Sequence, residues 1–320
     1  RGRCGSSARM NLLKRLGRLA VETASVLAGL LVATFLLVHL VPGDPARRAA
    51  GLEASGEQVE ALRRELGLDR PLLVQFASYV GTLASGDLGR SFLTREPVTK
   101  IIADRLPKTL YLASIAVGLM LLVSVPVGMA AAGVTWGGRN RSVDLGFTVA
   151  TSLMGALPPF LLATFLAFIF AVWLGLLPVA GATRWTSVIL PALAIALRPM
   201  AELARIVRVE TLNVLAQDYI RTARSKRLRP FRLYARHVLP NVLTAALTIG
   251  GLIFAHLIGG AVVIENVFAW PGLGTALVQA ILARDYPTIQ GVILLLGCVI
   301  IAVNTVVDLL LAIIDPRISK

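Results

Sequence analysis

Apolar runs of about 20 residues or more recur along this chain, and they limit its possible folds more than any other feature. A run of that length crosses the hydrocarbon core of a bilayer as one helix. Hydrophobic residues make up 56% of the 320 residues, against about 45–50% in soluble domains. The sequence therefore predicts an all-α polytopic membrane protein without a soluble core.

Six candidate spans can be placed, with both ends of the chain in the cytoplasm. The first is longer than the apolar region of about 7–15 residues in a secretory signal, which is the competing interpretation. Pro158 and Pro159 interrupt the third, where we expect a kink or a break. Gly251, Ala255 and Gly259 form a small-residue stripe in the fifth that would let another helix approach closely. The six spans cover residues 19–41, 107–135, 144–174, 188–207, 241–264 and 288–314.

The segments around the spans define the rest of the organisation. Residues 1–18 form a basic tail, expected in the cytoplasm, and residues 316–320 form a second cytoplasmic tail. Residues 42–105 form a long extracytoplasmic segment, because long loops cross the membrane largely regardless of their charge. The second to sixth spans, with the basic segment 208–240, form the membrane core of the protein at residues 106–315.

Short helices are expected within the extracytoplasmic segment. Ser55 and Gln58 have the spacing of a capping box, which predicts the start of a helix. Pro71 begins a second helix, and the glycine-rich stretch 86–89 ends it. Residues 96–105 could form a third, just before the second span.

The most basic segment lies between the fourth and fifth spans, at residues 208–240. A charged side chain costs about 2.5–3.5 kcal/mol at the centre of a bilayer, so this segment is expected to be a cytoplasmic loop. The net charge of +14 is explained by basic residues that cluster beside the spans. No nucleic-acid partner is therefore expected. The cations of the loop are Arg208, Arg221, Arg224, Lys226, Arg227, Arg229, Arg232 and Arg236.

Enzyme motifs are absent from the sequence. It contains no Gly-x-x-x-x-Gly-Lys-Ser/Thr, no Gly-x-Ser-x-Gly and no His-Glu-x-x-His. Cys4 lies in the tail and Cys298 in the last span, so neither a disulfide nor a thiolate metal site is expected. The sequence therefore predicts no catalytic residues and no metal site.

A few polar residues in or beside the spans are candidates for a pathway lining or an outer face. His256 lies within the fifth span, where an ionisable group is a functional candidate, although a neutral histidine bonded to a neighbouring helix fits equally well. Asn304 and Asp308 lie one turn apart in the sixth span, and interhelical hydrogen bonding is the alternative to a pathway lining. Glu265 and Asn266 follow the fifth span, where a loop anchor is the simpler interpretation.

Residues 221–240 resemble the coupling motif of permease subunits of bacterial binding-protein-dependent ABC importers, of the dipeptide, oligopeptide and nickel group. In that family the motif reads Glu-Ala-Ala, three residues, Gly, nine residues and Ile-x-Leu-Pro. Here Arg-Thr-Ala fills the first three places, and Leu-Pro closes the motif at the same spacing. Arg227 stands where the family has glycine, so we expect either a bend that is made in another way or an atypical coupling. The resemblance implies that residues 218–240 form short helices that sit in a groove on an ATPase subunit. It also implies coupling roles for Asp218, Tyr219, Arg221, Thr222, Ala223, Arg224, Arg227, His237, Leu239 and Pro240.

The resemblance extends over almost the whole chain. The segment Glu-Asn-Val-Phe-Ala-Trp-Pro-Gly-Leu-Gly at 265–274 is typical of the group, and it implies outer-face roles for Trp270, Pro271 and Gly272. Further matching segments are residues 41–45, 66–75, 86–92, 106–112, 284–287 and 315–318.

The resemblance implies a type I importer permease in the bacterial cytoplasmic (inner) membrane, which is not itself an enzyme. Its partners would be a second permease, two ATPase subunits, an extracytoplasmic substrate-binding lipoprotein and membrane lipid. ATP and Mg would bind the ATPase subunits, and this chain would hold no cofactor. Segments 42–105 and 265–287 would meet the binding protein. The expected substrates are di- or oligopeptides; nickel or another small solute is the alternative, and an ATP-independent channel or a membrane scaffold is a second one.

Overall fold

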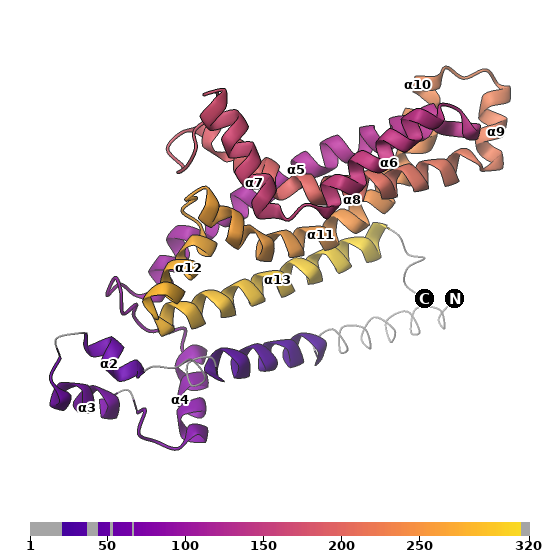
Figure 1. The fold of residues 1–320 in the computed structure, drawn as a ribbon. Helices are drawn as coiled ribbons and strands as arrows, with labels where there is room; N and C mark the ends of the chain where they lie inside the picture. Colours follow the sequence, from indigo (N-terminus) through magenta and orange to yellow (C-terminus); the bar gives the residue numbers. More distant parts are fainter. Residues whose placement is uncertain (1–20, 37–43, 52–53, 66, 315–320) are drawn as a thin grey trace, which may run out of the picture. The chain divides into compact units, whose positions relative to one another are not determined.

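The computed structural model describes residues 21–36, 44–51, 54–65 and 67–314 (Figure 1). Helices joined by turns make up this part of the chain, and no β-strand occurs within it. This agrees with the all-α fold predicted from the sequence.

The chain divides into two compact units. One comprises residues 1–106 and 276–305, and the other residues 107–275 and 306–320. The helices that lie wholly in the first unit are Val21–Leu36, α2 (Pro45–Ala50), α3 (Gly56–Glu65) and α4 (Leu72–Ala84). Those shared by both units are α5 (Val98–Thr135), α12 (Leu273–Ala283) and α13 (Tyr286–Ile314).

Helix α3 begins with the capping box predicted from the sequence. The backbone N–H of Gln58 donates to Ser55 Oγ at 3.3 Å, and the backbone N–H of Ser55 donates to Gln58 Oε1 at 2.9 Å. The predicted second helix is α4, which begins directly after Pro71. Gly86 and Gly89 adopt φ of +80° and +78°, a conformation that glycine takes without a steric penalty. The chain therefore leaves α4 and turns at the expected stretch.

Asp285 links the chain just after this turn to the start of α13, within the first unit. The side chain of Asp285, 2% exposed, accepts hydrogen bonds from Ser91 Oγ, the backbone N–H of Phe92 at 2.9 Å and Thr288 Oγ1 at 2.7 Å. A buried carboxylate without partners would be very costly. The three donors therefore make Asp285 the residue that holds the chain at residues 91–92 to the start of α13.

The expected third short helix is the beginning of α5 rather than a separate element. Helix α5 starts at Val98 and continues through Pro107 to Thr135. A proline inside a helix removes one backbone hydrogen bond, which is why the sequence favoured a boundary near residue 107. Val98 and Ile102 are buried in the first unit, and this packing stabilises the helix ahead of the proline.

The break predicted in the third span is present. Helix α6 (Arg141–Ala156) is followed by α7 (Pro159–Leu166), and the two are bent by 102°. Pro159 is the first residue of α7, a position where the missing N–H of proline has no helical partner to lose. A π-helical segment, η2 (Ala167–Trp173), continues α7.

Helix α8 (Ile189–Leu215) packs against α6, α7 and α11 (Leu239–Val267) within the second unit (Figure 1). Its buried side chains join an apolar cluster that includes Leu190, Ile195, Ile264 and Phe268. Gly128 of α5 lies directly against α8, since a Cβ at this position would lie 2.6 Å from the carbonyl oxygen of Ala204. The close contact between these two helices therefore depends on a glycine.

The small-residue stripe of the fifth span brings a second helix close at one of its positions. A Cβ on Gly251 would lie 2.5 Å from Val307 Cγ1 of α13, so the two helices approach closely there. A Cβ on Gly259 would have no neighbour within 4 Å. The side chain of Ala255 lies outside the described residues.

Four helices in the described residues are long and apolar enough to cross a membrane, or five if the bent pair α6–α7 is one span. They are consistent with a polytopic membrane protein but fall short of the six spans expected. The span that is missing from this set is the first one. Only Val21–Leu36 of it is described, and this helix is too short to be counted as a membrane span. The remainder of the expected span 19–41 lies outside the described residues.

Candidate functional site

The segment between α8 and α11 is folded into short helices, as the family resemblance implies. Helix α8 ends at Leu215, not near Val207, so the first eight residues of the expected 208–240 loop are helical. The chain then forms α9 (Asp218–Ser225), α10 (Pro230–Leu233) and the π-helical segment η4 (Tyr234–Val238), which leads into α11. We refer to residues 216–240 as the coupling segment.

One face of the coupling segment is part of the protein core. Ile220 and Val238 have no exposed surface, and Ala223 and Leu233 are only 6% and 5% exposed. These side chains join a second apolar cluster with residues of α5, α8 and α11, among them Met129, Leu203, Leu215 and Val242. Burial of this face fixes the orientation of α9, since apolar surface removed from water stabilises the packed arrangement.

The other face of α9 is open. The side chains of Asp218 and Arg221 are 95% and 82% exposed, and they form an ion pair at 3.7 Å. Thr222 and Ser225 are also exposed, and their hydroxyls donate only to carbonyls of their own helix. Among the predicted coupling residues, Ala223 is therefore turned inward, whereas Asp218, Arg221 and Thr222 are available to another protein.

Arg227 makes the bend that the family makes with glycine. Its φ is +54°, in the left-handed region that residues with a Cβ rarely adopt. The expectation that the bend would be made in another way is therefore wrong. An arginine occupies the same backbone conformation that favours glycine, between the end of α9 and the start of α10.

Three side-chain contacts hold the coupling segment against the helices beside it. The Arg224 guanidinium lies 5.4 Å from the centre of the Trp136 ring, a cation–π contact with the residue after α5. Tyr219 Oη accepts a hydrogen bond from Asn241 Nδ2 at 3.3 Å, and the carbonyl of His237 accepts one from the same amide at 2.8 Å. Of the remaining predicted coupling residues, Leu239 is half-buried and Pro240 is exposed.

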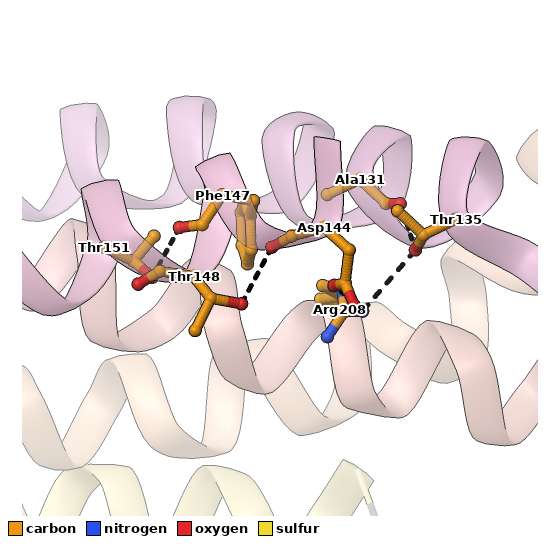
Figure 2. Close-up of polar contacts among 7 residues, drawn as sticks. All are labelled: Ala131, Thr135, Asp144, Phe147, Thr148, Thr151 and Arg208. Carbon is orange, nitrogen blue, oxygen red and sulfur yellow. Dashed lines mark hydrogen bonds and ion pairs between the residues drawn. The ribbon is translucent and has the colours of Figure 1, made fainter. Parts of the chain in front are cut away.

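An ion pair that sequence reasoning missed joins α6 to α8 just before the coupling segment (Figure 2). Arg208, with a side chain 19% exposed, pairs with Asp144 and donates to Thr135 Oγ1 at 3.5 Å. Its guanidinium also lies 5.8 Å from the centre of the Phe147 ring. The sequence did contain the two charges of this pair, an acidic residue in the first turn of α6 and an arginine near the end of α8. The pair was not predicted, because Arg208 was expected to lie in a loop.

Residues at the end of α11 and just after it, which were expected on the outer face, are mostly buried within the second unit. Glu265 has no exposed surface; its carboxylate accepts from Thr109 Oγ1 and from the backbone N–H of Gly274, both at 2.7 Å. Trp270, 4% exposed, donates from Nε1 to the carbonyl of Lys108 at 3.1 Å. Gly272 lies so close to the Glu265 carboxylate that a Cβ would overlap it. Asn266 is exposed and Pro271 half-buried.

This arrangement favours the anchoring role considered for Glu265. Its carboxylate holds the turn between α11 and α12 to α5, and the close glycine explains the Pro-Gly-Leu-Gly sequence. Nothing in the geometry presents Glu265 to a ligand.

The other pathway candidates do not form one cluster. His256 is exposed, with Nδ1 3.0 Å from the carbonyl of Leu252 in the preceding turn. Asn304 is half-buried, and the side chain of Asp308 lies outside the described residues. No group of three His, Cys, Asp or Glu side chains capable of holding a metal occurs in the part of the chain that the structure describes.

Two family models match the sequence. The model described as "Binding-protein-dependent transport system inner membrane component" matches residues 124–320. The model described as "Binding-prot-dependent transport system membrane comp, N-term" matches residues 12–113.

Curated relatives match along nearly the full length. A putative peptide transport system permease protein of Brucella suis biovar 1 is 44% identical over 315 residues, covering 96% of this chain and 98% of that protein. The glutathione transport system permease protein GsiC of Salmonella typhimurium is 42% identical over 308 residues, again covering 96% and 98%.

Solved structures share the fold at lower identity. An inward-facing structure of the MetNI methionine ABC transporter matches with a TM-score of 0.57 at 16% identity, covering 68% of this chain and 97% of that chain. A second crystal form of the same transporter gives a TM-score of 0.52. Given the family models and relatives 42–44% identical along 96% of the sequence, this chain belongs to the inner membrane components of binding-protein-dependent transport systems, the permease subunits of ABC importers.

Proposed function

We propose that this permease forms, with a sister permease, the translocation path of an importer for di- or oligopeptides. The observation that carries the proposal is the 42–44% identity with permeases named for peptide and glutathione transport, over 96% of this chain. Glutathione is itself a small peptide, so both names point to one substrate class. Nickel is less well supported, because the described residues contain no group of three potential metal ligands.

The remaining parts of the importer are proposed from the family. Two ATPase subunits would bind ATP and Mg, because this sequence has no Gly-x-x-x-x-Gly-Lys-Ser/Thr loop to hold a nucleotide. An extracytoplasmic binding protein would deliver the peptide to the outer side of the permease pair. This chain would hold no cofactor of its own.

The coupling segment is the proposed contact with an ATPase subunit. Its open face carries Asp218, Arg221 and Thr222, and its other face is buried in the permease core. A segment packed in this way would transmit a displacement to α5, α8 and α11 instead of absorbing it. Closure of the ATPases on ATP could then rearrange the membrane-spanning helices.

Six spans with both termini in the cytoplasm are proposed as the topology. Four helices, or five with the bent pair, are long and apolar enough in the described residues. The apolar residues 19–41 would supply the first span, and the basic tail 1–18 before them favours entry from the cytoplasm.

A pull-down of this chain in gentle detergent, followed by mass spectrometry, tests the proposal. The expected result is a second permease, ATPase subunits and a binding protein whose bound ligand is a peptide. As a functional measurement, ATP hydrolysis by the reconstituted assembly should rise when the peptide-loaded binding protein is added, and not with the empty one. Recovery of this chain as a homo-oligomer without any ATPase would instead support a channel or a membrane scaffold.

A further inference from the structure

Three charged side chains lie along one face of α8, a helix that is long and apolar enough to cross a membrane. They are Arg198, Glu202 and Arg205, spaced by four and three residues, which places them on one side of a helix. At a rise of 1.5 Å per residue they lie roughly 14, 20 and 24 Å from the start of α8 at Ile189. The whole span, Trp185–Leu215, is 31 residues long.

This charged face is the open side of an otherwise buried helix. The side chains of Arg198 and Glu202 are 50% and 41% exposed, and Arg205 is exposed as well. Most other residues of α8 pack against α6, α7 and α11. Since charged side chains inside a membrane face a polar cavity or a protein partner and not lipid, the open face of α8 cannot be a lipid-facing surface.

The charges on this face do not cancel. Arg198 Nε lies 3.3 Å from Glu202 Oε1, so these two residues neutralise each other. Arg208 is also accounted for, through its pair with Asp144. Within the described residues, no hydrogen bond or ion pair involves the Arg205 side chain. A guanidinium on the open face of a candidate membrane-spanning helix, without a hydrogen-bonded or ion-paired carboxylate, fits an anionic ligand.

Irregular backbone lies beside Arg205. A Cβ on Gly155 would lie 3.7 Å from a terminal nitrogen of Arg205, and Gly155 is the penultimate residue of α6, just before the 102° bend. Non-helical backbone at membrane depth is tolerated where it is buried in protein or lines a water-filled cavity, and Pro158 at this bend is exposed. Pro199 of α8 adds a second irregularity, because it lacks the N–H that would bond the Ile195 carbonyl.

We infer that Arg205, supported by the Arg198–Glu202 pair, binds the free carboxylate of the peptide as it crosses the membrane beside the α6–α7 break. The inference rests on the proposed function, because it needs a peptide to pass along this face. Arginine presents two parallel N–H groups to a carboxylate, which gives a directed contact. A peptide whose C-terminus is amidated cannot accept these bonds in the same way.

Uptake by the complete importer in proteoliposomes tests this inference. Two labelled peptides are compared that the binding protein binds equally, one with a free C-terminal carboxylate and one with a C-terminal amide. In the wild-type importer the free acid should be taken up faster. Arg205→Gln should lower uptake of the free acid about tenfold, the effect expected from loss of one charge-assisted hydrogen-bonded contact, and leave uptake of the amide unchanged. Arg205→Lys should keep part of the preference.

The control is Arg139→Gln, which removes one positive charge from the exposed turn between α5 and α6. It should leave the preference for the free acid unchanged. An Arg205→Gln importer that keeps the wild-type preference, or that loses uptake of both peptides equally, overturns the inference; the second outcome would indicate a structural contact or a pairing with the sister permease. Failure of the wild-type assembly to couple ATP hydrolysis to either peptide would instead refute the proposed function.

A second measurement does not depend on transport rate. With Cys4 and Cys298 replaced by serine, a single cysteine at position 205 should react with a charged, water-soluble thiol reagent in the assembled importer. A cysteine at Leu122, an apolar residue of α5 that is 74% exposed, should not react, because we expect it to face lipid. An unreactive cysteine at 205 would place this residue outside a polar cavity.

Discussion

Arg227 holds a conformation that penalises every residue with a Cβ. The left-handed region costs such residues about 1–2 kcal/mol, and at Arg227 φ is +54°. The resulting strain lies between α9 and α10, in the segment proposed to contact an ATPase.

Replacing Arg227 with glycine should therefore stabilise the protein. We expect a gain of about 0.5–1 kcal/mol after allowing for the greater freedom of glycine in the unfolded chain, seen as a higher midpoint of thermal unfolding in detergent. Arg227→Ala is the matched control, because it removes the charge but keeps the Cβ, and its midpoint should stay near that of the wild type. A midpoint for Arg227→Gly no higher than that of Arg227→Ala would show that the strain is absent or relieved elsewhere.

At this scale the sequence identified important positions better than it identified their roles. The bend at Arg227 was located correctly, but the means of making it was not. Glu265 is the loop anchor that the sequence favoured, and its carboxylate accepts a hydrogen bond from Thr109 of α5. Trp270 and Gly272, expected on an outer face, are buried beside it. A pairing across 156 residues leaves no periodic signal in a sequence, so the partner of Glu265 could not be read from it.

The ion pair between Arg208 and Asp144 joins α6 to α8 just before the coupling segment. Arg208 is largely buried and also contacts Thr135 and Phe147. Removing one partner leaves the other charge poorly satisfied, and this costs more than the intact pair contributes.

Asp144→Ala should therefore destabilise the protein, by about 1–2 kcal/mol, between the values for exposed and for fully buried pairs. The exchange of both residues, Asp144→Arg with Arg208→Asp, should recover part of that loss, because the opposite charges again face each other. Thermal unfolding of Asp144→Arg, Arg208→Asp and the variant that carries both changes, each in detergent, gives the coupling energy between the two side chains. Additive effects in the double variant would mean that the two charges do not interact.

The sequence predicted elements well where the signal was local. The capping box at Ser55 and Gln58, the break at Pro158 and the start of α4 after Pro71 all follow from neighbouring residues. It failed at α5, where Pro107 suggested a boundary and tertiary packing carries the helix through it. The short helices of the coupling segment were expected from the family resemblance. The burial of Ile220 and Val238 was not predicted, because it depends on three other helices.

The proposed topology makes a prediction about the molecule as a whole. Ser85, at the end of α4, should lie outside the membrane, and Ser225, the last residue of α9, should lie in the cytoplasm. In a background without Cys4 and Cys298, a membrane-impermeant thiol reagent should label a cysteine at 85 in intact cells. A cysteine at 225 should react only after the membrane is permeabilised.

Labelling of both positions from the same side would contradict an odd number of crossings between them. A cysteine at the exposed Ser78 of α4 is the control for the outer side, and it should behave like the cysteine at 85. This measurement does not depend on which peptide is transported.

The division of α9 into a buried and an open face affects which substitutions such a subunit can accept during evolution. Substitutions at Ile220 or Ala223 alter the interior of the permease, and each must be compatible with α5, α8 and α11. Substitutions at Asp218, Arg221 or Thr222 alter only the surface offered to another protein. With the ATPase contact proposed above, partner choice and internal stability would be encoded by different residues of one eight-residue helix. A permease would then be matched to a foreign ATPase by exchanging a few exposed side chains while its own fold stays intact.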